Sequence, residues 1–171
     1  MIDPNHLHPM IVHFPIALVI IGFLSDVIGL LTKRKFFASA GLYLIILGTA
    51  GTVAAYLTGG LAGDGIEEAG ALGAALHTHE SAALLAIWTM VILASLRTTL
   101  AITRRMTGWL QWVMVILLAF GVGTVARTGY YGGNLVYQHA AGVQLTLGTI
   151  ETQSTVSPEP VLPSNASEDI D

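Results

Sequence analysis

The chemistry in this sequence is carried by histidine, because its six copies all lie near the ends of apolar segments. They are His6, His8, His13, His77, His79 and His139. Imidazole can ligate haem iron or another metal, carry a proton, or donate a hydrogen bond at a membrane surface. The stretch LHPMIVHFPIALVI, residues 7–20, places two of these histidines and two prolines at the start of an apolar run. Because ionisable groups are costly in lipid, this stretch is an expensive choice for a simple anchor.

A b-type haem is the cofactor that this histidine set suits best. It needs two axial imidazoles and no cysteine, and the sequence has no cysteine. We expect His13 and His79 to be the axial pair, because both lie at the start of apolar segments that run in the same direction. His8 and His139 are the alternates, or a second pair if two haems bind. Arg127, the only basic residue near this end, is a candidate partner for a haem propionate.

Small residues within two of the apolar segments bear on the same question without deciding it. They admit a porphyrin between helices, or they only let the helices pack closely. These residues are Gly48, Gly51, Ala54, Gly121 and Gly123.

Three other interpretations of the histidines stay open. His79 with Glu80, or the HTH stretch at 77–79, offers ligands for copper or zinc. His79 and Glu80 with Asp64 or Glu67 form a candidate proton relay. The plainest interpretation is structural, with each imidazole hydrogen-bonded to lipid headgroups, water or a neighbouring carbonyl. No convincing catalytic triad, phosphate-binding loop or carboxylate pair is present, so we expect a non-catalytic electron-transfer or accessory subunit.

The composition predicts an integral membrane protein. Of 171 residues, 53% are hydrophobic and 11% are charged, against about 25% charged in soluble domains. Four apolar segments reach the roughly 20 residues that a spanning helix needs; they cover residues 9–32, 37–59, 81–100 and 109–128. We expect an all-α four-helix membrane bundle over residues 1–150, and a disordered acidic tail over 151–171. No extended basic face suggests nucleic-acid binding.

The basic residues predict the orientation of the bundle. Six of the seven lie at one end, in the stretch 33–35 and at Arg97, Arg104 and Arg105. The positive-inside rule places that end in the cytoplasm, with both termini and a long loop over residues 60–80 on the periplasmic side. Asp26, inside the first segment, is expected to pair with Lys33 or Arg97, because a buried carboxylate is costly without a partner.

Three motifs resemble those of the family called domain of unknown function 2231, a group of small bacterial four-helix membrane proteins. They are HPMIVHFPIAL at 8–18, HES at 79–81 and GGNLVYQHAAGV at 132–143, within a resemblance that covers roughly residues 7–145. The positions that carry it are His8, His13, His79, His139, Gly132, Gly133 and Tyr137.

The resemblance also implies a setting. Relatives are found fused to or encoded beside cytochrome components, which implies electron transfer and a b-type haem. We therefore expect a subunit of a respiratory or photosynthetic complex that contacts other membrane subunits, a second copy of itself, lipids, and a quinone or cytochrome c. The tail beyond about residue 150 departs from the family pattern.

Overall fold

The protein folds as four long helices. The computed structural model describes residues 4–63, 70–106 and 108–141, and in this part of the chain there is no strand. The helices are α1 (Pro4–Thr32), α2 (Lys35–Gly63), α3 (Gly70–Ile102) and α4 (Trp109–His139). Each is long and apolar enough to cross a membrane, which confirms the predicted all-α fold and its four spans. The predicted acidic tail over 151–171 lies outside the described residues.

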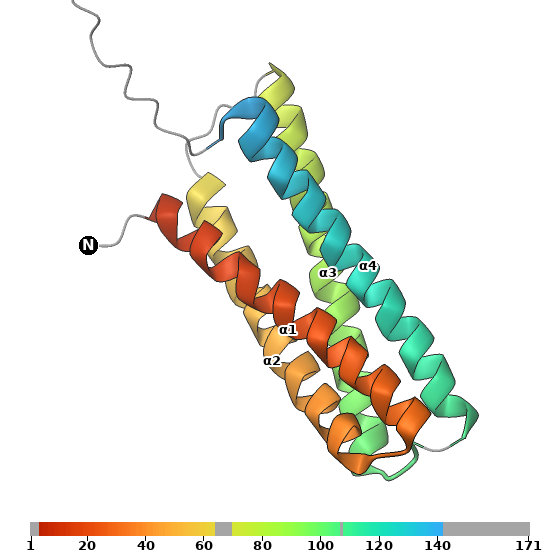
Figure 1. Cartoon of the computed structure of the whole chain (residues 1–171). Coiled ribbons are helices and arrows are strands. Elements are labelled where there is room, and N and C mark those ends of the chain that lie inside the picture. The colour runs from red at the N-terminus through yellow and green to blue at the C-terminus, as the bar shows by residue number, and fades with distance from the viewer. Residues whose placement is uncertain (1–3, 64–69, 107, 142–171) are drawn as a thin grey trace, which may run out of the picture.

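The helices form two antiparallel hairpins, α1–α2 and α3–α4 (Figure 1). Contacts within each hairpin outnumber those between the hairpins. In Figure 1, α1 and α3 begin where α2 and α4 end, and we call this the histidine end. The opposite end, which carries residues 33–35 and Arg104, is called the basic end. The membrane side that each end faces remains a prediction from the charges.

Glycines allow the helices of each hairpin to pack closely. A Cβ atom added at Gly48 would lie 2.7 Å from the Val19 side chain, and one added at Gly51 would lie 3.1 Å from Pro15. At Gly121 an added Cβ would meet side chains of α3. These three glycines therefore serve helix packing, which was one of the two roles that the sequence left open.

The apolar core occupies the middle of the bundle. Its fully buried side chains are Val19 on α1, Ile45 on α2, Met90 on α3, and Met114 and Leu118 on α4. The cluster that they form reaches Ala86 on α3 and Val125 on α4 in the direction of the histidine end. The histidines at 8 and 79 thus lie beyond this cluster.

The helices extend further at the histidine end than the apolar pattern predicted. α3 begins at Gly70 instead of residue 81, and α4 ends at His139 instead of residue 128. The expected loop over 60–80 was therefore wrong, because residues 60–63 and 70–80 are helical. A hydropathy search finds only the segment that lipid requires, whereas paired helices can continue beyond it. The prediction that α1 begins at Pro9 or Pro15 was also wrong, since both prolines lie inside a helix that starts at Pro4.

Candidate functional site

The side chain of His8, on α1, contacts α2 at the histidine end. Its Nδ1 atom lies 2.9 Å from the Ala55 carbonyl oxygen and 3.3 Å from the Thr58 hydroxyl. The ring rests against Gly59, where an added Cβ would lie 3.0 Å from the imidazole Cε1 atom. The half-buried ring of His8 is thus held by a carbonyl and a glycine on the neighbouring helix.

His79 makes the same arrangement in the second hairpin. Its Nδ1 atom lies 3.2 Å from the Thr128 carbonyl oxygen on α4. A Cβ added at Gly132 would lie 3.1 Å from Cε1 of the ring. In both hairpins the glycine follows the carbonyl residue by four positions, about one helical turn. Each hairpin therefore presents one imidazole that is oriented by its neighbouring helix.

These bonds determine which ring nitrogen is free. A carbonyl oxygen can only accept a hydrogen bond, so Nδ1 carries the proton in both rings. In the neutral imidazole, Nε2 then keeps its lone pair, and this is the atom that can ligate a metal. Both rings lie at the histidine end of the bundle, one in each hairpin (Figure 1). His8 and His79 therefore each offer an oriented Nε2 lone pair, and two imidazoles are the ligand chemistry of a bis-histidine b-type haem.

His13 lies on a different side of α1 from His8. Five residues correspond to about 140° of rotation around a helix beyond one full turn. The His13 ring is exposed, and its Nδ1 atom donates to the Pro9 carbonyl of its own helix at 2.8 Å. His139 is the half-buried last residue of α4. Of the predicted ligands, His8 and His79 are thus each bonded to the neighbouring helix of their hairpin, while the exposed ring of His13 is bonded to its own helix.

Arg127 is exposed on α4 and contacts an aromatic side chain. Its Nη2 atom donates to the Tyr131 hydroxyl at 3.4 Å, and its guanidinium carbon lies 5.2 Å from the Tyr131 ring centroid. Arg127 thus makes a cation–π contact with Tyr131. Its binding to a haem propionate stays a prediction.

The proton relay and the non-haem metal site each depend on acidic partners. Glu80 is exposed on α3, and Asp64 and Glu67 lie outside the described residues. Over residues 4–63, 70–106 and 108–141, no three histidine or carboxylate side chains gather in one place. Zinc sites usually take at least three protein ligands, so the described side chains suit a two-ligand centre better.

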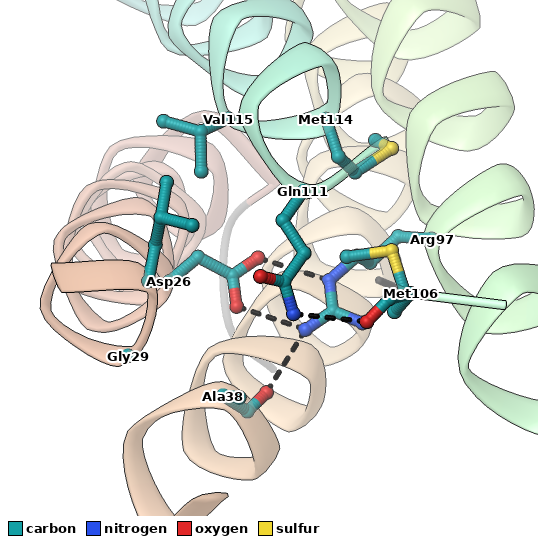
Figure 2. A pocket seen from close by; sticks show the side chains of 9 residues that line it. Asp26, Gly29, Ala38, Arg97, Met106, Gln111, Met114 and Val115 are labelled. Carbon is teal, nitrogen blue, oxygen red and sulfur yellow. Dashed lines mark hydrogen bonds and ion pairs between the residues drawn. The ribbon is translucent and has the colours of Figure 1, made fainter. Parts of the chain in front are cut away.

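A buried ion pair lies near the basic end (Figure 2). Arg97 donates from Nε and Nη2 to the two carboxylate oxygens of Asp26, each at 3.0 Å. Nη2 also donates to the Ala38 carbonyl on α2 at 3.1 Å. Gly41 makes room for the carboxylate, because an added Cβ there would collide with it. Both charged side chains are 5% exposed, and the prediction that Asp26 pairs with Lys33 or Arg97 is confirmed for Arg97.

A small cavity adjoins this pair. Its volume is about 40 Å³, and Gln111 and Met106 line it together with the two charged residues. Gln111 is itself fixed by a hydrogen bond to the Met106 carbonyl at 2.9 Å. The space is large enough for a water molecule.

Sequence reasoning missed the partners that orient the two rings. Ala55, Thr58, Gly59 and Thr128 carry no recognisable motif, because a backbone carbonyl or a missing Cβ leaves no chemical signature. A glycine on the helix that faces each histidine was the available signal; Gly132 was named only as part of the family resemblance, and Gly59 was not singled out.

The fold and these two pairs define a four-helix membrane bundle with an imidazole pair at one end and an ion pair toward the other. The chain belongs to the family described as "Predicted membrane protein (DUF2231)", whose model matches residues 4–145. This confirms the resemblance seen in the three motifs. The chain matches no curated protein and no solved structure.

Proposed function

We propose that this protein is a bacterial inner-membrane subunit that binds haem b near its histidine end and takes part in electron transfer within a larger complex. His8 and His79 are the axial ligands in this proposal. The observation that carries it is the matched arrangement of the two rings. In each ring a carbonyl oxygen accepts a hydrogen bond from Nδ1, and the lone pair of Nε2 is free to ligate a metal. Bis-imidazole ligation is one of the ways in which a chain without cysteine can hold haem iron.

The residues around the pair act as its supports. The carbonyls of Ala55 and Thr128 hold each ring in one tautomer, and such outer partners typically raise the basicity of a ligating imidazole. Gly59 and Gly132 let each ring approach the neighbouring helix closely. When bound, haem supplies one-electron chemistry that the side chains cannot provide. Arg127 is the basic residue near the histidine end, and we propose that its guanidinium binds a haem propionate.

The partners follow from the same setting. A subunit of this size with no recognisable catalytic motif depends on other chains for its electrons, so we propose other membrane subunits or a second copy as neighbours. A quinone or a cytochrome c exchanges the electron. The charge distribution supports a periplasmic histidine end.

A structural role for the two histidines is the competing proposal. The same Nδ1 bonds join α1 to α2 and α3 to α4, and that alone is a reason to keep an imidazole at each position. The two proposals differ in what they require of Nε2, which is a ligand in the first and plays no part in the second.

The deciding experiment is a reduced-minus-oxidised visible spectrum, with metal analysis, of the full chain purified from cells supplied with haem. We expect b-type Soret and α bands in the wild type and their loss in both His8→Ala and His79→Ala. The matched variant His13→Ala should keep them, because its ring is exposed and bonded within its own helix.

Each other outcome has a definite meaning. Loss of the bands in His13→Ala with retention in His8→Ala would restore His13 and His79 as the axial pair. A colourless protein with stoichiometric copper or zinc would replace haem by another metal. A colourless, metal-free protein that still assembles with its partners would leave the histidines structural.

A further inference from the structure

The ion pair and the histidine pair have the same spacing on two different helices. Asp26 follows His8 by 18 residues on α1, and Arg97 follows His79 by 18 residues on α3. At 3.6 residues per turn, 18 residues are about five whole turns and about 27 Å. On each helix, the charged residue and the histidine therefore share one face.

The two helices also run in the same direction. α1 and α3 both begin at the histidine end (Figure 1). A contact between Asp26 and Arg97 at one level therefore brings His8 and His79 to one common level, five turns away. A slip of α3 by a single turn would separate the two imidazoles by about 5.4 Å along the bundle.

Polar contacts between the two hairpins are concentrated at Arg97. Among the described residues, His8 bonds to α2 and His79 bonds to α4, so both bonds stay within a hairpin. The side-chain hydrogen bonds that join one hairpin to the other run from Arg97 to Asp26 and to Ala38. Apolar packing is non-directional, whereas a two-point guanidinium–carboxylate contact has one geometry.

We propose that the Asp26–Arg97 ion pair is a positioning clamp that holds α1 and α3 at the register in which His8 and His79 lie at one common level. The clamp does not touch the cofactor; it acts through the helices. The consequence of the clamp for haem binding rests on the function proposed above. Its effect on the register of α1 and α3 does not. A buried ion pair often adds little net stability compared with apolar residues of similar size, and specifying register is the best-attested reason to keep one.

The test measures the register directly, by spin labelling of the full chain in lipid nanodiscs. The sequence has no cysteine, so labels can be placed at will. A reporter pair at Met10→Cys and Thr78→Cys, both exposed, measures α1 against α3. A control pair at Met10→Cys and Tyr56→Cys measures α1 against α2 inside one hairpin.

The clamp is removed by the double variant D26L/R97M, which leaves no unpaired charge in the bundle. We expect the reporter distance to shift or its distribution to broaden, because a slip along the bundle axis changes the separation of labels on α1 and α3, while the control distance stays unchanged. R97K keeps the charge and loses the two-point contact, so it should give a smaller change in the same direction. If D26L/R97M also loses the control distance, R97K alone decides the question.

An unchanged reporter distance in a folded clamp variant would overturn the proposal. The haem spectrum of the same samples separates the two hypotheses. A shifted distance in a protein without haem bands supports the clamp and rejects the haem function. Haem bands and a reporter distance that both survive in D26L/R97M reject the clamp and leave the haem function standing. If both proposals hold, the low-spin, six-coordinate fraction of the haem falls as the reporter distance changes.

Discussion

Replacing Gly132 by alanine tests whether the orientation of His79 matters for function. The added methyl would lie 3.1 Å from Cε1 and 3.5 Å from Nδ1 of the imidazole. Because 3.1 Å is shorter than an ordinary contact, the ring must move away by a few tenths of an ångström. That movement strains the bond from Nδ1 to the Thr128 carbonyl, which is already 3.2 Å long.

The size of the effect follows from the role of that bond. Loss of an outer partner of a metal-bound histidine typically costs 10–100-fold in affinity, about 1.4–2.7 kcal/mol. We expect a loss of haem affinity in this range for Gly132→Ala, measured by titrating the haem-free protein with haem. The positions of the Soret and α bands should also change if the His79 ring is no longer held at one angle.

The neighbouring residue supplies the control. A Cβ added at Gly133 would meet nothing within 4 Å, and alanine is favoured over glycine inside a helix by about 1 kcal/mol in water. Gly133→Ala should therefore bind haem like the wild type and be at least as stable. Equal haem affinity in Gly132→Ala and Gly133→Ala would refute the reasoning, because the contact with the His79 ring is what separates the two positions.

Three further predictions follow from the other contacts. Gly59→Ala should weaken haem binding about 10–100-fold through the His8 ring, whereas Gly60→Ala, with open space at its Cβ, should not. Arg97→Ala leaves a buried carboxylate without its partner, so we expect a loss of about 3–5 kcal/mol in unfolding free energy, measured by denaturant titration in detergent. A single cysteine at Thr78 should react with an impermeant thiol reagent from the periplasmic side, and one at Thr103 should not.

Each of these predictions has a contrary result. Equal haem affinity in the two α2 variants would remove the role assigned to Gly59. Lys33→Ala, at an exposed position, is the control for the ion pair, and an Arg97→Ala variant no less stable than Lys33→Ala would contradict the cost assigned to the buried charge. Labelling at Thr103 but not at Thr78 would reverse the orientation in the membrane.

The fold class was predictable because lipid imposes a simple demand on sequence. A spanning helix must be apolar for about 20 residues, and four segments meet that demand. The helix ends were not predictable from the same signal, since α3 and α4 continue beyond the apolar stretches as a packed pair. Gly132, one of the positions that carry the family resemblance, lies inside α4 and makes room for a ring from the facing helix.

The location of the histidines at one end of the bundle was predictable, and their pairing was less so. The sequence indicated which histidines gather at one end, because helix direction decides that. The face of α1 on which each histidine lies depends on rotational phase. His8 and His13 differ by about 140° in phase, and the sequence alone does not say which phase faces α3. The bond between Asp26 and Arg97 supplies that information, since it marks the facing sides of both helices.

The spacing between the two pairs has a physical meaning in a bilayer. Five turns cover about 27 Å, close to the roughly 30 Å thickness of the hydrocarbon layer. The ion pair and the imidazole pair therefore lie near opposite boundaries of that layer, with the apolar core of Val19, Ile45 and Met90 between them. Ionisable groups are least costly near these boundaries. In the proposed function, the same placement would let a haem held by the Nε2 atoms of His8 and His79 reach an electron partner at the membrane surface, while the proposed clamp acts from the far side of the bundle.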